Sequence, residues 1–111
     1  MRAECPEGDF AADATVVAVD YDMCVPGSLA TGAALFLVDD REQYLANRRG
    51  TVFDGYPSEA MTIGDAIVAG EPRPAGRVLI SHLGVGLADV LFADAVLGTA
   101  EGIGVGTLLD R

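Results

Sequence analysis

The segment from residue 77 to residue 98 constrains the fold of this chain most strongly. It joins an apolar run at residues 77–81 to a glycine turn containing Gly84 and Gly86, and then to a second apolar stretch. The run predicts a buried strand, and the stretch after the turn predicts a helix over 84–98. Nucleotide-binding α/β domains are built from such strand–turn–helix units. Because no phosphate-binding glycine loop precedes this unit in the sequence, we expect the second half of such a domain.

The rest of the chain repeats the alternation of strands and helices. Residues 15–19 and 34–38 predict two more buried strands, and residues 39–49 and 61–69 predict helices, the second with Thr62 as its N-cap and Gly70 at its end. The uninterrupted apolar character of 34–38 favours a parallel sheet that is covered on both faces. The sequence therefore predicts an α/β fold: the second half of a Rossmann-like parallel sheet with flanking helices, in an incomplete domain. The helix over 84–98 is apolar on more than one face, so we expect it to be buried on two sides, with a flexible tail at 102–106. Three strands leave exposed sheet edges, which favours pairing with another copy or membership of a larger protein.

Composition excludes several classes of function. The chain has 111 residues, seven arginines, no lysine and a net charge of -10, so it offers no basic surface for nucleic acid or for an anionic membrane. His82, Asp89 and Asp94 interrupt the most apolar stretch, which argues against a membrane-spanning helix. The acidic N-terminus lacks the apolar segment of a signal peptide. We expect a soluble, cytoplasmic protein.

The two cysteines, Cys5 and Cys24, have no CxxC spacing. They would form a disulfide in an oxidising compartment, but two free thiols are favoured for a cytoplasmic protein. His82 is the sole histidine and has no partner at a metal-ligand spacing, so we predict no metal site.

The glycine turn allows two interpretations. Gly84 and Gly86 follow a strand and open a helix, as in a dinucleotide-binding GxGxxG loop, but Asp89 stands where the third glycine would be. A carboxylate at that position would repel a pyrophosphate. We therefore favour glycines that permit close backbone packing over a pyrophosphate site.

Polar residues follow two of the predicted strands. Asp20 and Asp22 come just after the first strand, and Ser81 and His82 end the last one. In open parallel sheets ligands bind at the carboxyl edge, where an acid would serve as a general base or hold a substrate amine. Turn capping by the aspartates and a hydrogen-bonded structural histidine are the favoured alternatives. Ser81 has no GxSxG surroundings and adjoins His82 on a strand, so no Ser–His–Asp triad is predicted.

An ordered set of segments resembles the ornithine cyclodeaminase/mu-crystallin family. The segments are Val38-Asp-Asp-Arg-Glu-Gln43, Thr62-Ile-Gly-Asp-Ala-Ile-Val-Ala-Gly70, Gly76-Arg77 and Ile80-Ser-His-Leu-Gly84, followed by Asp89. The resemblance covers roughly residues 13–106. It implies the C-terminal part of an NAD- or NADP-dependent enzyme that transfers a hydride and deaminates an amino acid or acts on a cyclic imine. Such enzymes are lyases or oxidoreductases and form homodimers.

The resemblance also implies roles for residues of this chain. Ala18-Val-Asp-Tyr-Asp22 stands where the family carries its catalytic acid, which gives that role to Asp22. Ser81, His82, Leu83 and Gly84 fall where the family lines the nicotinamide pocket. The whole chain, 1–111, would be the C-terminal part of an NAD(P)-binding Rossmann-like domain. Its tail, from about 99 to 111, would return toward a substrate and dimerisation domain.

Departures from the family pattern widen the range of substrates that the sequence predicts. After the acid, Met23-Cys-Val-Pro-Gly-Ser-Leu29 keeps the Pro-Gly of ornithine-specific members but lacks their lysine and glutamate. The substrate is therefore predicted only as an amino acid or an imine. Because the sequence contains no complete GxGxxG loop, we expect the isolated chain not to turn over by itself. A non-catalytic α/β module that dimerises or docks to a partner is the alternative.

Overall fold

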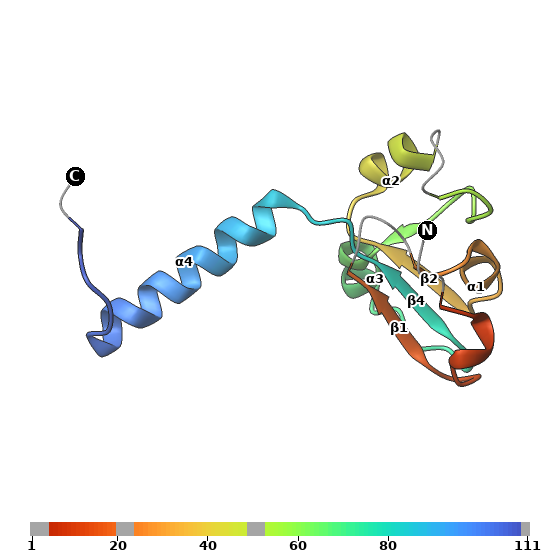
Figure 1. The fold of residues 1–111 in the computed structure, drawn as a ribbon, viewed down its shortest axis with the longest axis horizontal. Helices are drawn as coiled ribbons and strands as arrows, with labels where there is room; N and C mark the ends of the chain where they lie inside the picture. Colours follow the sequence, from red (N-terminus) through yellow and green to blue (C-terminus); the bar gives the residue numbers. More distant parts are fainter. Residues whose placement is uncertain (1–4, 20–23, 49–52, 110–111) are drawn as a thin grey trace.

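The structure of this chain is a computed structural model that describes residues 5–19, 24–48 and 53–109. Four strands form one parallel sheet: β1 (Thr15–Ala18), β2 (Leu35–Val38), β3 (Met61–Thr62) and β4 (Val78–Ser81), in the order β1-β4-β2-β3. The helices are α1 (Gly27–Thr31), α2 (Arg41–Arg48), α3 (Ile63–Ala69) and α4 (Gly86–Ile103), with a short 3₁₀ helix, η1 (Glu7–Asp9) (Figure 1). A parallel sheet with flanking helices is the predicted α/β class, and its arrangement is consistent with part of a Rossmann-like domain.

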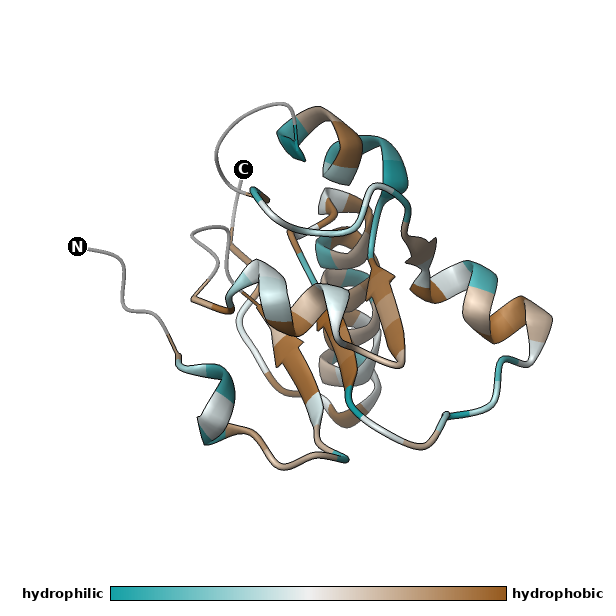
Figure 2. Ribbon diagram, turned by 90° about the vertical axis from the view of Figure 1, so that its right-hand side faces the viewer, coloured by the Kyte–Doolittle hydropathy of each residue, from teal (hydrophilic) through white to brown (hydrophobic). Residues whose placement is uncertain are grey.

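The three predicted strands are present, and a fourth was missed. β3 has only two residues, which pair with Leu37 and Val38 of β2. The strands are mostly hydrophobic (Figure 2). The predicted cover on both faces is absent at β1, where Val17 is 54% exposed. Within the described ranges, no helix combines the length and the apolar character that a membrane crossing requires.

The main core lies on one face of the sheet. Side chains alternate along each strand, so Phe36 and Val38 of β2 face this core while Leu35 and Leu37 face α3. The core is completed by α1, α2 and residues 53–56, and its aromatic members pack edge to face with ring centroids 4.9–5.9 Å apart. The members of this aromatic cluster are Phe36, Tyr44, Phe53 and Tyr56. Edge-to-face pairs of this kind add stability beyond the area that they bury.

Hydrogen bonds of two buried tyrosines fix the segments that cover the core. The Tyr56 hydroxyl donates to the Val25 carbonyl oxygen at 2.6 Å, and the Tyr44 hydroxyl donates to the Pro57 carbonyl oxygen at 2.5 Å. Burial raises the pKa of Tyr44, although Arg48 nearby opposes that shift. At Gly27 the backbone of residues 54–55 approaches so closely that a Cβ atom would lie 2.7 Å from the Gly55 carbonyl carbon.

Local signals set the ends of the helices. The Thr62 side chain accepts a hydrogen bond from the Asp65 amide at 3.0 Å and caps α3, which ends at Gly70 in a left-handed conformation, as the sequence predicted. Asp40 caps α2 in the same way, because its Oδ1 accepts a hydrogen bond from the Gln43 amide at 2.6 Å.

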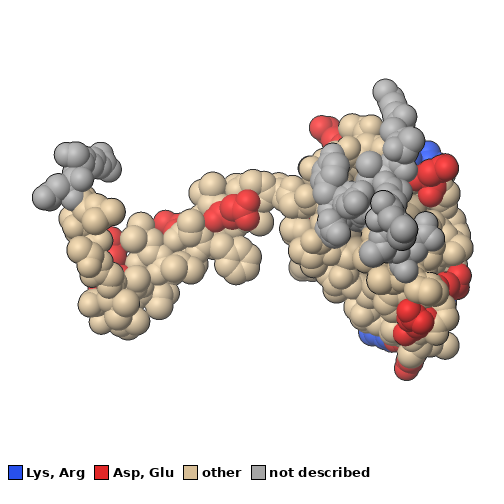
Figure 3. Space-filling model, in the orientation of Figure 1, with Lys and Arg blue, Asp and Glu red and all other residues tan. Residues whose placement is uncertain are grey.

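The prediction for α4 was wrong in two respects. The helix continues to Ile103, so Gly102 and Ile103, expected in a flexible tail, are helical, and Gly104 ends the helix with φ +68°. None of its residues is buried, and it projects away from the sheet (Figure 1) instead of being covered on two sides. Figure 3 shows a mostly uncharged surface on this helix, with a few acidic side chains. The predicted apolar character is therefore present, but it is exposed.

Candidate functional site

The carboxyl ends of three strands meet at one edge of the sheet. Ser81 at the end of β4 is in register with Ala18 at the end of β1 and with Val38 at the end of β2. The His82 amide donates to the Ala18 carbonyl oxygen at 2.8 Å, so the ladder between β1 and β4 continues one residue past the strand. Residues 81–84 therefore leave the sheet between the ends of β1 and β2, at the edge where parallel sheets bind ligands.

The predicted site residues on β4 and its turn differ in exposure. Ser81 is 1% exposed and belongs to the interior, whereas the His82 side chain is 36% exposed. Leu83 packs against the main core. Gly84 has φ +91°, a conformation that side-chain-bearing residues rarely adopt. Asp20 and Asp22, the latter being the predicted acid, lie outside the described residues.

Close packing explains neither glycine of the turn, and a backbone conformation that needs glycine explains only Gly84. A Cβ atom on Gly84 or on Gly86 would meet no other atom within 4 Å, which contradicts the packing explanation. Gly84 is required by its positive φ, and Gly86 is the first residue of α4. The preceding residue, Val85, gives this helix no side-chain cap.

Asp39 is the residue of this edge that sequence reasoning missed. It follows β2, its side chain is 6% exposed, and its Oδ2 accepts hydrogen bonds from the amides of Leu83 (2.9 Å) and Gly84 (2.8 Å). Its Oδ1 accepts a third from the Asp40 amide at 2.9 Å. The carboxylate thus fastens the turn after β4 to the end of β2. A signal for it existed in the sequence: two aspartates follow the strand, and a helix needs only one as its cap.

His82 lies beside this carboxylate. Its Nδ1 is 3.7 Å from Asp39 Oδ2, which is too long for a hydrogen bond but close enough for an ion pair when the imidazole is protonated. The two side chains therefore lie close together at the edge of the sheet. Among the residues that the structure describes, no group of three histidine, cysteine, aspartate or glutamate side chains is arranged to hold a metal ion.

Three of the cavities formed by described residues lie away from residues 81–84, which line none of these three. One of 950 Å³ lies between α2 and β3 and includes Arg41 and Asp65, whose side chains form an ion pair at 2.8 Å. One of 320 Å³ lies between α3 and the sheet, and one of 380 Å³ lies at the end of α4 beside Val105. These cavities lie away from the carboxyl edge of the sheet. The strand register and the Asp39 hydrogen bonds, by contrast, fix particular polar atoms at that edge, which makes it the candidate site.

No protein-family model matches this chain, and no curated protein or solved structure matches it either.

Proposed function

We propose that this chain is the C-terminal part of an NAD- or NADP-dependent enzyme of the ornithine cyclodeaminase/mu-crystallin type, acting on an amino acid or a cyclic imine. The supporting observation is the register of β1 and β4, in which Ala18 pairs with Ser81. The resemblance assigns its acid to the segment after β1 and its nicotinamide-lining residues to the segment after β4. Those two segments leave adjacent strands at the same edge, as a shared site requires.

Residues 82–84 suit the edge of a flat cofactor ring. The turn is open around Gly84, where an added Cβ atom would meet nothing, and the half-exposed imidazole of His82 stands beside it. The Leu83 and Gly84 amides already donate to Asp39, so they would hold the shape of the turn and not bind the ring. When bound, the nicotinamide would supply a hydride acceptor and donor.

In this proposal Asp22 handles protons. Its carboxylate would accept a proton from the substrate ammonium group, which frees the nitrogen lone pair that oxidation at the neighbouring carbon needs. Asp39 would act through the turn that it holds, as a positioning residue. His82, whose Nδ1 lies 3.7 Å from Asp39 Oδ2, would line the same edge beside the cofactor ring.

The test is an amino-acid-dependent reduction of NAD⁺ or NADP⁺ by the complete enzyme of which this chain would be the C-terminal part, purified from the cells that produce it, with release of ammonia measured in parallel. We expect turnover in the unaltered protein, a loss of about a hundredfold or more in Asp22→Asn, and no loss in Asp13→Asn. Asp13 is a matched control because it is exposed and lies before β1, at the opposite end of the strand. Equal activity of the two variants would refute the role of Asp22, and absence of any turnover would refute the enzyme.

A second candidate is a non-catalytic module that dimerises or docks to a partner, and the exposure of α4 favours it. Its large apolar side chains are 57–74% exposed, and Ile67 and Val68 on α3 are exposed as well. Soluble monomers rarely leave large contiguous apolar patches uncovered. Sedimentation velocity decides this candidate: a stable homodimer or a stoichiometric complex supports it, and a folded, monodisperse monomer contradicts it.

A further inference from the structure

The two cysteines, far apart in the sequence, are neighbours in the fold. The Cys5 amide donates to the Cys24 carbonyl oxygen at 2.9 Å, and both residues are half-buried free thiols. A hydrogen bond with the Cys24 thiol, followed by repulsion between the two sulfurs when ionised, raises the pKa of Cys5. Both effects require that the side chains lie side by side and not merely their backbones. A direct backbone hydrogen bond of 2.9 Å brings the two chain segments as close together as neighbouring strands, which is the proximity that a disulfide needs.

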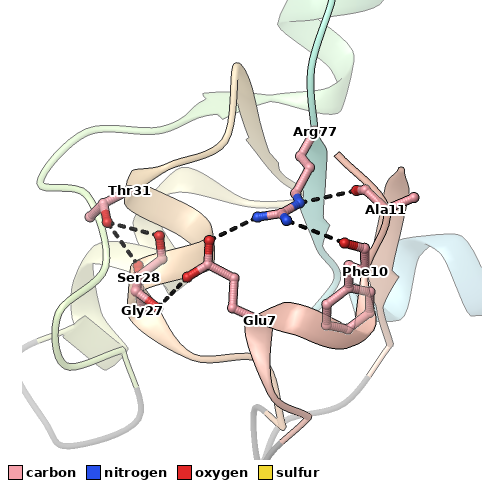
Figure 4. Close-up of polar contacts among 7 residues, drawn as sticks. All are labelled: Glu7, Phe10, Ala11, Gly27, Ser28, Thr31 and Arg77. Carbon is pink, nitrogen blue, oxygen red and sulfur yellow. Dashed lines mark hydrogen bonds and ion pairs between the residues drawn. The ribbon is translucent and has the colours of Figure 1, made fainter. Parts of the chain in front are cut away.

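Contacts on both sides of the pair hold this geometry. Glu7, two residues after Cys5, is fastened through one carboxylate oxygen to Arg77 at 2.8 Å and accepts a hydrogen bond from the Ser28 hydroxyl at 3.2 Å through the other (Figure 4). The Arg77 guanidinium also donates to the carbonyl oxygens of Phe10 and Ala11, so it anchors the first residue of η1 and the two residues that follow this helix. We refer to Glu7, Ser28 and Arg77 as the clasp.

The segment that carries Cys24 is anchored independently of the clasp. Val25, the next residue, is 4% exposed and belongs to the main core. Its carbonyl oxygen accepts the 2.6 Å hydrogen bond from the buried Tyr56 hydroxyl. Two anchored segments therefore present the thiols to one another, and forming a bond between the sulfurs requires little further ordering of the chain.

We propose that Cys5 and Cys24 are a redox-sensitive pair that forms an intramolecular disulfide by exchange with a low-molecular-weight disulfide such as oxidised glutathione. One cysteine thiolate attacks the reagent, forms a mixed disulfide and displaces one glutathione thiolate. The other cysteine then attacks the protein sulfur of that mixed disulfide and displaces the second glutathione. The protein loses two hydrogens and gains one S–S bond, while the reagent takes up two electrons and two protons and becomes two thiols. The bond closes a loop that contains η1 and the edge strand β1. This proposal does not depend on the function proposed above.

The test equilibrates the folded protein with defined ratios of reduced and oxidised glutathione, quenches it with acid, and counts alkylated thiols by intact mass. Because the chain contains only two cysteines, an unalkylated monomer lighter by two hydrogens can only be the Cys5–Cys24 disulfide. We expect the two thiols to disappear together. Glutathione adducts that never resolve, disulfide-linked dimers, or two thiols that persist in excess oxidised glutathione would each overturn the proposal.

Two variants test whether the fold holds the pair together. Glu7→Ala removes the clasp, so we expect the equilibrium constant for the disulfide to fall about two- to fivefold, the effect of a partly exposed ion pair. Glu101→Ala makes the same change on α4, far from the thiols, and should leave the constant unchanged. A constant insensitive to both would mean that the clasp does not position Cys5. In Cys5→Ser, oxidised glutathione should form a glutathione adduct on Cys24 in place of the internal disulfide. This result tests the disulfide itself, whatever the effect of the clasp.

Discussion

Replacing Asp39 with asparagine tests whether its carboxylate holds the turn after β4. The wild-type side chain is 6% exposed and accepts three backbone hydrogen bonds, one through Oδ1 and two through Oδ2. Asparagine keeps one acceptor oxygen and presents an NH₂ group in place of the other. Whichever way the amide is turned, that NH₂ group faces at least one backbone N–H, so a donor is opposed by a donor.

The magnitude follows from counting these bonds. Hydrogen bonds to a charged group contribute about 1.5–3 kcal/mol and neutral ones about 0.5–1.5 kcal/mol, so the bonds that survive are weakened by about 1 kcal/mol each. The orientation that keeps both bonds to the turn loses the third, to the Asp40 amide. Two weakened bonds and one lost bond together lower the free energy of unfolding by about 3.5–5 kcal/mol. With an m-value of about 1.5 kcal/mol/M, the urea midpoint would fall by about 2.3–3.3 M.

Asp40→Asn is the matched control, because it makes the same charge change at the next residue. Asp40 Oδ1 caps α2 through the Gln43 amide at 2.6 Å, and asparagine is as good an N-cap as aspartate. The free energy of unfolding of Asp40→Asn should differ from that of the wild type by less than about 0.5 kcal/mol. Hydrogen exchange at the Leu83 and Gly84 amides should accelerate in Asp39→Asn alone. Equal midpoints for the two variants, with unchanged exchange at both amides, would refute the role given to Asp39.

Three further results are expected from the packing and from the pKa shift. Gly27→Ala places a methyl group 2.7 Å from the Gly55 carbonyl carbon and should cost about 1–3 kcal/mol in thermal unfolding, whereas Gly64→Ala, with its nearest contact at 3.8 Å, should gain about 0.5–1 kcal/mol. Thr62→Ala removes the cap of α3 and should cost about 1 kcal/mol in urea unfolding. Burial raises the pKa of Tyr44, so the folded state holds its phenol proton more tightly than the unfolded chain does. The contribution of Tyr44 to stability should be constant below pH of about 10 and fall as pH rises through the folded-state pKa, so the alkaline loss of stability should be smaller in Tyr44→Phe.

Features determined by neighbouring residues were predictable from the sequence. The apolar runs that became β1, β2 and β4 carry their own signal, as do the Thr62 cap and the Gly70 end of α3. The two-residue strand β3 carries none, because it exists only through its pairing with β2. Its residues, Met61 and Thr62, are indistinguishable in sequence from the start of a helix.

The candidate site was predictable only in part, because it also depends on pairing between segments that are distant in the sequence. The residues after β1 and β4 could be named as an edge group, but the order β1-β4-β2-β3 inserts the last strand between the first two. That insertion brings the turn at 82–84 beside Asp39, and no local pattern encodes it. Asp39 also had a competing local explanation as a helix cap, a role that Asp40 fills.

The wrong prediction for α4 follows from what a hydrophobic pattern measures. Seven large apolar side chains on this helix are 57–74% exposed: Leu87, Val90, Leu91, Phe92, Val96, Leu97 and Ile103. Full burial of such a side chain contributes about 1.5–3 kcal/mol, so covering what is exposed here would contribute on the order of 10 kcal/mol. That sum is comparable to the whole stability of a small domain. The pattern correctly indicates a strong drive toward burial, but it carries no information on which surface provides it. Since these side chains surround the helix axis, a single flat surface would cover only some of them, and full burial requires contacts from more than one side.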